Sequence, residues 1–406
     1  MTQRLYYQDS YLKEFKARIL KKIKIGNQPA VILDRTAFYP TSGGQPFDKG
    51  VVQDTPVVEV VEEGKKIIHI LREEIEEDIN SEVTGRIDWE RRFDHMQQHL
   101  GQHILSGALM KLWGAETVSF HLGEEVCTLD ISKEKFSEEE AKKAEECANE
   151  IIFDNRSVKC YFVGREEDLR RLNLRKISNR KGKLRIVEVE NFDLSACGGT
   201  HCRATGEVGL IKITKWEKRG EKTRLEFICG RRAWEDYFWK NELIKNISNK
   251  LTIKDSELSE VIDRILEERK EIRKELKEFK ERLQTWEARD IINEPSSLKD
   301  GEIKIVKKVF EEKNFQEIRE LVQKIINLND RMVVLFGVKD AGARILFACS
   351  RGLKYDMSGL VREAGKFIEG RGGGAPNFAQ AGGKKAEGID KALDFALKNL
   401  RNFVKE

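Results

Sequence analysis

The sequence predicts an α+β protein of four parts, and three observations carry this prediction. Short apolar stretches broken by Gly and Pro occupy the beginning of the chain, and a mixture of helical and strand-like periodicities follows. The chain then becomes highly charged and helical before a last segment with mixed periodicities and many glycines. We therefore expect a small β-barrel over residues 1–90, an α+β domain over 91–232, a coiled helical arm over 233–295 and a small glycine-rich α/β domain over 296–406.

The composition of the whole chain fits a folded protein of several domains, because it has 406 residues and a hydrophobic content of 39%. Neither an apolar signal core nor an apolar run of about 18 residues is present, so we expect no export, no membrane span and a cytoplasmic location. Seven scattered cysteines indicate reduced thiols and not a disulfide framework.

Charge gives a local signal and no global one, since 74 Lys and Arg barely exceed 70 Asp and Glu. Basic residues are dense over residues 165–185 and again over 215–232, where Trp216 and Trp234 lie nearby. Such segments can neutralise phosphates, or they can be ordinary solvated faces of a highly charged chain.

The first part of the chain reads as short strands with turns between them, over residues 30–33, 51–52, 57–61, 67–71 and 82–87. A small barrel or meander is the natural packing. Gly43 and Gly44, in the loop of residues 41–46, would let backbone N–H groups approach a ligand, or they could simply form a hairpin turn.

Apolar residues at helical spacing predict a helix over residues 89–113. Within it His99 and His103 are four residues apart and share a face, as two metal-ligating histidines on a helix do, although His95 and His99 have the same spacing. Cys197 and His201 flank two glycines, which favours a tight loop on which a thiolate and an imidazole converge. Nitrogen and sulfur ligands in this mixture suit Zn²⁺ best, and Cys202 is an alternative ligand.

The rest of this domain alternates between strands and one helix. Strands are expected over residues 117–121, 126–131, 158–163, 184–189, 209–216 and 223–229. A helix is expected over 137–155, because Ser137 and Glu140 match a capping box, and the three acids that follow Ser137 lie at the positive end of the helix. The sheet should support both halves of the metal site.

The charged segment that follows carries apolar residues at steps of three and four from Leu258 to Trp286, interrupted at Arg269. This is the heptad spacing of a coiled coil, so the stripe needs a partner helix. The partner could be the preceding segment, residues 234–251, folded back, or the same helix of a second subunit.

The last part should contain strands over residues 303–309, 332–338 and 345–348 and helices over 315–326, 358–368 and 388–404. Residues 370–383 read as a glycine loop that could hold backbone amides around phosphate oxygens or act as a flexible lid. No GxxxxGK[ST] pattern fits there, so a phosphate-binding loop of nucleotide hydrolases is not expected.

Three motifs in order resemble one known family. They are the run from Thr36 to Pro46, the pair His99 and His103 followed by Ile-Leu-Ser, and the CGGTH of residues 197–201. Together they resemble the editing domain of alanyl-tRNA synthetase and its free-standing relatives, the AlaX proteins. With the arm and the glycine-rich domain, whose counterpart in the synthetase contacts tRNA, the arrangement is similar to the long form of AlaX.

The resemblance implies a site as well as a family. It favours His99, His103, Cys197 and His201 as the zinc ligands and makes His95 a neighbour of the site. Around the aminoacyl group it implies Thr36 as the main contact with a serine hydroxyl, with Gln45, Gln102 and His121 as polar neighbours and Gly43 and Gly44 in the adjoining loop. No catalytic side chain is identified; a water positioned by zinc is the expected nucleophile. Four protein ligands would make the ion structural, whereas three and a water would make it catalytic.

The activity implied is hydrolysis, without ATP, of the ester in mischarged tRNA(Ala), chiefly Ser-tRNA(Ala), with Gly-tRNA(Ala) as a second substrate. Residues 1–90 leave no room for an aminoacylation domain, so the chain should remove an amino acid and not activate one. The alternatives are a zinc-stabilised RNA-binding module without hydrolysis and a deacylase of another ester such as Ser-tRNA(Thr). Partners should be mischarged tRNA(Ala) and a second copy bound through the arm or the C-terminal domain.

Overall fold

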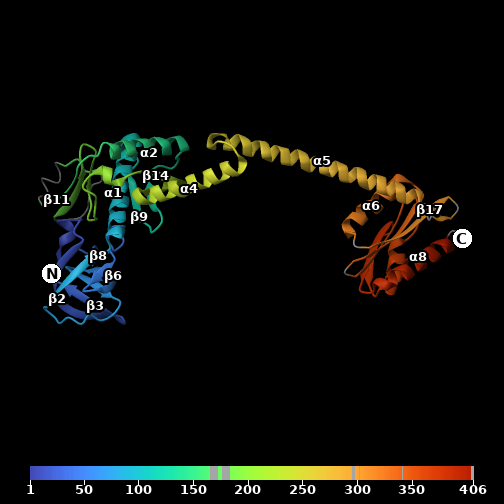
Figure 1. Ribbon diagram of the computed structural model, residues 1–406, viewed down its shortest axis with the longest axis horizontal. Helices are drawn as coiled ribbons and strands as arrows, with labels where there is room; N and C mark the ends of the chain where they lie inside the picture. The colour runs from blue at the N-terminus through green and yellow to red at the C-terminus, as the bar shows by residue number, and fades with distance from the viewer. Residues whose placement is uncertain are drawn as a thin grey trace. The chain divides into compact units, whose positions relative to one another are not determined.

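The computed structural model describes residues 1–164, 172–175, 183–294, 298–300, 302–311, 313–340 and 342–403. The chain forms two compact units, Met1–Asp255 and Ser256–Glu406 (Figure 1). Helices and sheets occur in both units, which confirms the α+β class. Most of the basic segment 165–185 and the expected boundary at 295 and 296 lie outside the described residues. The expected boundary after residue 232 falls within a helix.

A closed six-stranded barrel begins the first unit, in the order β2-β3-β7-β6-β5-β8. Its longest strand, β2, was not anticipated, although Phe15, Ala17 and Ile19 alternate with charged residues and point inward. Strand β1 and the 3₁₀ turn η1 precede the hairpin of β2 and β3, and strand β4 follows it. Strands β1 and β4 pair with each other in parallel. The bounds are β1 (Gln3–Arg4), η1 (Leu5–Tyr7), β2 (Glu14–Ile25), β3 (Gln28–Leu33), β4 (Arg35–Thr36), β5 (Gly50–Val52), β6 (Thr55–Glu63), β7 (Lys66–Leu71) and β8 (Glu82–Ile87).

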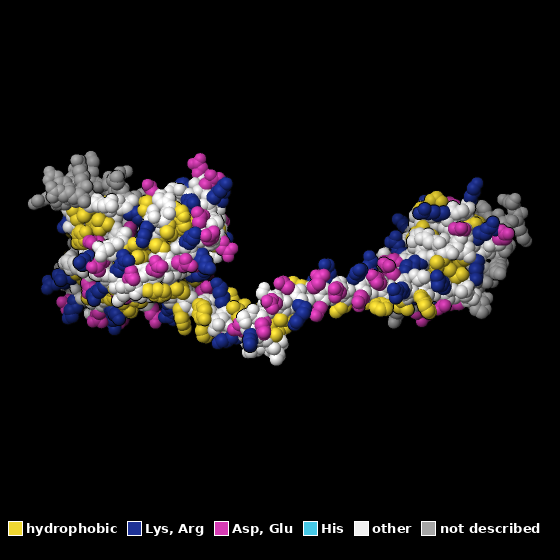
Figure 2. Space-filling view, turned by 90° about the horizontal axis from the view of Figure 1, so that it is seen from above, with side chains coloured by type: hydrophobic (Ala, Val, Ile, Leu, Met, Phe, Trp, Pro, Cys, Tyr) yellow, Lys and Arg dark blue, Asp and Glu magenta, His cyan; other side chains and the backbone are white. Residues whose placement is uncertain are grey.

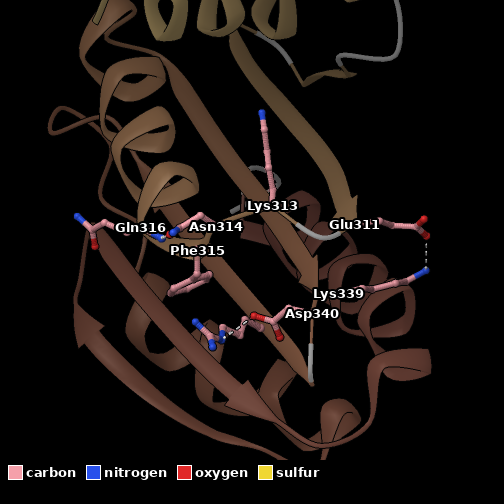
Figure 3. Close-up of a pocket in the computed structure, with 8 residues that line it drawn as sticks. Glu311, Lys313, Asn314, Phe315, Gln316, Lys339 and Asp340 are labelled. Atoms are coloured by element: carbon pink, nitrogen blue, oxygen red, sulfur yellow. Dashed lines mark hydrogen bonds and ion pairs between the residues drawn. The ribbon is translucent and has the colours of Figure 1, made fainter. Parts of the chain in front are cut away.

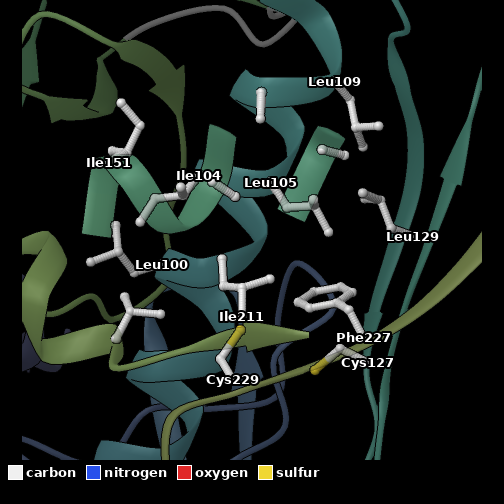
Figure 4. Packing of buried hydrophobic residues seen from close by; sticks show 14 of the residues in the cluster. Leu100, Ile104, Leu105, Leu109, Cys127, Leu129, Ile151, Ile211, Phe227 and Cys229 are labelled. Carbon is white, nitrogen blue, oxygen red and sulfur yellow. The ribbon is translucent and has the colours of Figure 1, made fainter. Parts of the chain in front are cut away.

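Helix α1 (Trp89–Trp113) is the central element of the first unit. Asp88 caps its first turn by accepting from the Arg91 amide, and Gly114 ends it in the left-handed conformation. The helix packs between α2 and an antiparallel sheet of order β14-β15-β10-β9. Figure 4 shows Leu100, Ile104 and Leu105 of the helix among Ile151 of α2 and Leu129, Ile211 and Phe227 of that sheet. The bounds are β9 (Thr117–Leu122), β10 (Cys127–Ile131), α2 (Glu138–Phe153), β14 (Ile211–Arg219) and β15 (Lys222–Cys229).

A second, three-stranded antiparallel sheet carries the cysteine loop, in the order β11-β12-β13. Its strands are β11 (Val158–Val163), β12 (Leu184–Val189) and β13 (Asp193–Ala196), and the 3₁₀ turn η2 (Thr205–Val208) follows the loop. Because β13 ends at Ala196, the loop that begins at Cys197 is fixed at the edge of this sheet. The predicted capping box of α2 is present, with Ser137 and Glu140 bonded to each other's backbone.

Two long helices carry exposed apolar side chains. Helix α4 (Gly230–Leu251) ends the first unit and exposes Trp234, Tyr237, Phe238 and Trp239 by 53–64%. After η3 (Asp255–Glu257), helix α5 (Leu258–Asn293) begins the second unit, and its apolar stripe is exposed as far as Trp286, at 69%. Figure 2 shows acidic and basic side chains interspersed along α5 with hydrophobic ones between them. The expected partner helix thus stays a prediction.

The second unit is built on a six-stranded sheet of order β16-β17-β18-β19-β21-β20. Side chains alternate across β18, so Val333 and Leu335 pack under α7 and α8, while Val334 and Phe336 pack under α6 and the end of α5. The bounds are β16 (Leu298–Asp300), β17 (Ile303–Glu311), α6 (Phe315–Leu328), β18 (Met332–Lys339), β19 (Ala343–Cys349), α7 (Met357–Gly365), η4 (Lys366–Ile368), β20 (Arg371–Ala375), β21 (Phe378–Gly383), η5 (Ala386–Gly388) and α8 (Ile389–Phe403).

The expected glycine loop of residues 370–383 is instead the hairpin of β20 and β21, paired from Arg371 and Gly382 to Ala375 and Phe378. The glycines allow close packing here. A Cβ on Gly372 would lie 2.4 Å from the Ala381 Cβ, and one on Gly383 would lie 2.0 Å from the Ile368 carbonyl oxygen. Glycine therefore serves strand packing at these positions, and the expectation of an open loop was wrong.

A cavity of about 1040 Å³ opens beside the N-terminus of α6 in the second unit (Figure 3). Its cations are paired with acids: Lys339 lies 3.7 Å from Glu311, and Arg344 lies 3.3 Å from Asp340. The cavity consequently carries little uncompensated charge for an anionic ligand. Among the described residues, no helix combines the length and the apolar character that crossing a bilayer would require.

Candidate metal and active site

Helix α1 presents two histidines side by side within the protein interior. His99 and His103 are each 3% exposed, and their rings stack with centroids 5.4 Å apart, as residues one helical turn apart do. Apolar residues on the same helix, Leu100 and Ile104, are fully buried against α2 and the four-stranded sheet. Because that packing fixes the helix, it also fixes the two imidazoles.

The loop after β13 brings Cys197 and His201 to these histidines. The Cys197 Sγ lies 3.3 Å from the His99 Nε2 and 3.6 Å from the His201 Nε2. One ligand atom from each of His99, His103, Cys197 and His201 lies within 4.8 Å of the others. The four residues favoured by the sequence therefore form one cluster, and neither His95 nor Cys202 belongs to it.

The cluster has the properties of a metal site. The His103 Nε2 and the His201 Nδ1 are buried and have no hydrogen-bond partner among the described residues. Around a tetrahedral zinc ion, sulfur and nitrogen ligands lie about 3.6 Å apart, close to the two separations measured from Cys197. A cation among these four donors would satisfy the His103 Nε2, which is otherwise costly to bury, whereas His201 would bind through its Nε2, the atom near Cys197.

The electrostatic surroundings of Cys197 favour its thiolate form, which can bind a cation. Burial by itself would raise its pKa, but the facing imidazoles of His99 and His201 bring the pKa well below its usual range. Burial lowers the pKa of His201 to about 3, which keeps this ring neutral. A metal ion requires a thiolate and neutral imidazoles, so a bound cation would have to displace a proton from His103, whose pKa burial lowers but Asp193 and Cys197 raise to about 9.

Gln45 joins the helix to the cysteine loop. Its side chain is fully buried, and its Oε1 accepts from the His99 Nδ1 at 2.9 Å and from the Thr200 amide at 3.1 Å. Its Nε2 donates to the Thr200 hydroxyl at 2.8 Å. Since the His99 Nδ1 bonds to Gln45, the Nε2 is left to face Cys197, which selects the ring orientation needed for a ligand.

A buried carboxylate lies behind His103. The Asp193 Oδ2 is 3.4 Å from the His103 Nδ1, and the Asp193 Oδ1 accepts from the Arg175 Nε at 2.6 Å. Burial raises the pKa of Asp193, but His103 and Arg175 outweigh this and lower it to about 2. The sequence analysis missed both partners. Histidines that bind a metal usually donate their second ring N–H to a carboxylate. The sequence offered one hint of such a carboxylate, because Asp193 lies four residues before Cys197.

Arg185, also missed, holds the cysteine loop from the other side. It is 7% exposed, and its Nη1 donates to the Cys197 carbonyl at 3.1 Å and to the Gly199 carbonyl at 2.8 Å. The position of Gly199 is tight as well, since a Cβ there would lie 2.2 Å from the His99 Cε1. The second glycine of the CGGTH motif is therefore required by the close approach of the loop to His99.

The glycines of the 41–46 loop form the two-residue turn considered above. Ser42 and Gln45 exchange two backbone hydrogen bonds, and Gly43 and Gly44 have φ of 59° and 86°. The Gly44 carbonyl accepts from the Leu122 amide at 3.0 Å, which fixes the turn against β9. The turn therefore lies beside Phe120, whose ring is 5.5 Å from that of His99.

Thr36, the expected reader of a serine hydroxyl, lies within the barrel and is fully buried. Its hydroxyl lies 2.8 Å from the His69 Nε2 and accepts from the Phe38 amide at 3.1 Å. The His69 Nδ1 is 3.3 Å from the Val31 carbonyl, so Nδ1 carries the proton and Nε2 accepts from Thr36. Both hydrogen-bonding roles of this hydroxyl are thus in use.

The remaining expected residues are in different surroundings. Gln102, one residue before His103, is 6% exposed and donates to the Ser106 hydroxyl at 2.7 Å. His121 is exposed on β9. His95 is buried one turn before His99, and burial followed by the charge of Arg91 lowers its pKa to about 3.

Family models match three parts of the chain. The family model of the threonyl and alanyl tRNA synthetase second additional domain matches residues 184–226, which include the cysteine loop. The model of class II (A) tRNA synthetases matches residues 4–91, and the DHHA1 domain model matches residues 302–402.

Curated relatives cover the whole chain. It is 34% identical to an alanine–tRNA ligase of Pyrococcus abyssi over 98% of its own length but only 44% of the ligase, so it spans less than half of that relative. Among solved structures, the C-Ala domain of the Aquifex aeolicus alanyl-tRNA synthetase matches 26% of this chain and 98% of its own, at 25% identity and a TM-score of 0.25. The chain is 31% identical to the alanyl-tRNA editing protein AlaX-L of Pyrococcus horikoshii over the full length of both. It therefore belongs to the AlaX family of alanyl-tRNA editing proteins.

Proposed function

We propose that this protein is a trans-editing hydrolase that deacylates mischarged tRNA(Ala), chiefly Ser-tRNA(Ala), with Gly-tRNA(Ala) as a second substrate. The observation that carries the proposal is the buried cluster of His99, His103, Cys197 and His201 in a chain similar over its full length to an alanyl-tRNA editing protein. The reaction adds water to the ester and releases the amino acid and the tRNA hydroxyl, so it needs no ATP.

The proposed metal is Zn²⁺, because two or more imidazoles and a thiolate are its preferred ligands. When bound there, zinc supplies a positive charge that can polarise the ester carbonyl or acidify a water, provided that one coordination position is open to them. The chain's own contribution is positional. Gln45 orients His99, Asp193 orients His103, and Arg185 holds the loop of Cys197. An aminoacyl ester is already reactive, so orientation in a fixed cleft provides much of the acceleration.

The metal content gives the first test. Protein purified without added metal should contain one zinc per chain, and His103→Ala or Cys197→Ala should remove it. His95→Ala is the matched control, because His95 is a buried histidine of the same helix outside the cluster. Full zinc retention by both cluster variants would disprove the ligand assignment.

Selectivity for serine over alanine requires a group that gains a hydrogen bond only with the serine hydroxyl. A site whose polar group is left unpaired by alanine can discriminate by orders of magnitude. Thr36 is the proposed group, and Gln45, Gln102 and His121 are the further candidates, but recognition through Thr36 would have to exchange its bond to His69. Thr36→Val should narrow the ratio of serine to alanine release while zinc content is unchanged. If the folded, zinc-loaded variant keeps the ratio of the parent protein, the selectivity lies elsewhere, and Gln45, Gln102 and His121 are the next residues to test.

The activity itself is tested with a deacylation panel of Ser-, Gly-, Ala- and Thr-charged tRNA. Release from Ser-tRNA(Ala), slower release from Gly-tRNA(Ala) and none from Ala-tRNA(Ala) is the expected result. Binding of these tRNAs by zinc-loaded protein without any hydrolysis would favour the zinc-stabilised RNA-binding module. Faster release from Ser-tRNA(Thr) than from Ser-tRNA(Ala) would favour the alternative function, a deacylase of another aminoacyl ester.

We further propose that the arm and the second unit supply affinity for the body of the tRNA and no ester chemistry, since all four cluster residues lie before α4 and the second unit begins after it. A homodimer through α5 or the C-terminal domain is part of the proposal, because the apolar stripe of α5 is exposed. A cytoplasmic location also stays a prediction.

A further inference from the structure

A corner of two aromatic rings lies outside the metal cluster and has no part in the reaction described above. Tyr7, at the end of η1, and Phe162, in β11, have ring centroids 5.6 Å apart and planes at 78°. Phe162 is 43% exposed and Tyr7 is half-buried. The neighbouring rings of Tyr6 and Tyr39 are almost fully buried and belong to the packed interior. The rings of Tyr7 and Phe162, by contrast, remain accessible to a ligand.

The corner borders the cysteine loop through Arg185. In the register of β11 and β12, Phe162 is paired directly with Arg185, whose Nη1 donates to the carbonyls of Cys197 and Gly199. The guanidinium of Arg185 also lies 5.4 Å from the centroid of the Tyr7 ring. A Cβ on Gly198 would lie 3.5 Å from the Tyr7 Oη. A substrate held at the cluster would thus extend naturally over the corner.

Cations surround the two rings. The Lys183 Nζ is 5.0 Å from the centroid of Phe162, and the Arg4 guanidinium is 5.7 Å from that of Tyr7. Arg4 is partly neutralised by an ion pair with Glu62, whereas Lys183 is exposed. Exposed aromatic rings interleaved with lysine and arginine are the composition that binds single-stranded nucleic acid, with rings for bases and cations for phosphates.

We propose that Tyr7 and Phe162 form the subsite for the base of the terminal nucleotide of an aminoacyl-tRNA, with Lys183 and Arg4 close to its phosphates. This inference rests on the proposed function, because it takes the ester of that nucleotide to lie at the cluster. The base is a purine in tRNA, and its large π-face suits stacking in a corner. The subsite binds the nucleotide that carries every amino acid, so it provides affinity without selecting between serine and alanine.

The test uses the full chain and an uncharged RNA hairpin whose 3′-terminal base is 2-aminopurine, which loses fluorescence when it stacks. The parent protein should quench this probe. Tyr7→Leu and Phe162→Leu should each abolish most of the quenching and weaken binding roughly 5- to 100-fold, the usual range for one stacked base. In Ser-tRNA hydrolysis the same variants should raise KM while leaving kcat nearly unchanged.

Two variants serve as controls. Tyr7→Phe retains the ring and should quench like the parent. Phe153→Leu removes an aromatic that is 75% exposed at the end of α2, outside the corner, and should also have no effect. Zinc content and the unfolding temperature establish that the leucine variants are folded.

Parent-like quenching and affinity in both folded leucine variants would overturn the subsite. This outcome is distinguishable from failure of the proposed function. If the parent hydrolyses no aminoacyl ester, the function fails, yet quenching of the uncharged hairpin still reports on the corner. If hydrolysis is present and the leucine variants bind the probe normally, only the subsite is lost.

Discussion

Gln45 is the residue that most directly controls the geometry of the cluster. Gln45→Ala should lower zinc affinity about 10- to 100-fold, the usual cost of removing a partner that orients a ligating histidine. The physical reason is that the His99 Nδ1 and the Thr200 amide both lose their acceptor. Zinc affinity is measured by competition with a chelator. Gln102→Ala is the control, because this neighbouring amide contacts Ser106 and no ligand; equal affinity in both variants would contradict the role of Gln45.

His69 predicts a pH dependence of stability. Burial lowers its pKa from 6.5 to about 4, although a bond to the Val31 carbonyl opposes this. Between pH 6.5 and 4 the unfolded chain therefore binds a proton here that the folded chain does not. The free energy of unfolding should fall by about 3 kcal/mol as pH drops through this window and should not fall further from this group below pH 4.

The contribution of His69 is isolated by comparing denaturant unfolding of the parent and of His69→Gln across this window. The difference between the two stabilities should change with pH, whereas His121→Gln, at an exposed histidine, should follow the parent. A difference that is constant from pH 6.5 to 4 would show that His69 does not resist protonation.

At the level of single residues, the sequence could reveal the ligands and not what orients them. His99 and His103, or Cys197 and His201, lie four positions apart, so their spacing is visible locally. Gln45 lies 54 residues before His99, and Arg175 reaches His103 only through Asp193. Contacts of this kind depend on how the barrel and the two sheets pack, which no local pattern contains.

At the level of elements, helices with strong end signals were the most predictable. The expected helix of residues 89–113, predicted from apolar residues at helical spacing, coincides with α1, whose ends are capped at Asp88 and Gly114. Strand β2 was missed because the alternation of apolar and charged residues breaks after Ile19, at Leu20, Lys21 and Lys22, and only closure of the barrel gives the apolar residues an interior. The glycine hairpin of β20 and β21 was missed for a related reason, since glycine frequency alone does not separate a loop from closely packed strands.

The cysteine loop allows a test between two adjacent glycines. A Cβ on Gly199 would lie 2.2 Å from the His99 Cε1, while one on Gly198 would make an ordinary contact of 3.5 Å with the Tyr7 Oη. Gly199→Ala should therefore displace His99, lower zinc affinity and destabilise the fold by about 1–3 kcal/mol, the usual cost of overpacking.

Gly198→Ala is the matched control for this loop and should keep zinc and most of its stability. The two variants are compared by thermal unfolding with and without a chelator. If Gly199→Ala lowers the unfolding temperature only by weakening zinc binding, the difference between the two variants disappears once the chelator has removed zinc from both. Equal zinc affinity in the two variants would show that the loop accommodates a side chain at Gly199.

At the level of the whole molecule, ester chemistry and the contact with the terminal nucleotide are proposed to reside in the first unit, and affinity for the rest of the tRNA in the second. The first unit, residues 1–255, includes the cluster, the barrel and α4. A fragment for testing this division should end at Asp255 and not after Arg232, because α4 begins at Gly230 and Arg232 is paired with Asp94 at 2.6 Å. Cutting at the boundary expected from the sequence would remove most of that helix.

The fragment of residues 1–255 should hydrolyse a seryl ester on a short acceptor-stem hairpin as fast as the full chain. With Ser-tRNA(Ala) its KM should rise at least about tenfold, equivalent to about 1.4 kcal/mol of lost binding, while kcat is retained. Circular dichroism and zinc content establish that the fragment is folded. The hairpin substrate is the internal control, because it lacks the parts of tRNA that a second unit could contact. If the fragment matches the full chain on complete Ser-tRNA(Ala) at limiting concentration, tRNA affinity belongs to the first unit and residues 256–406 serve another purpose.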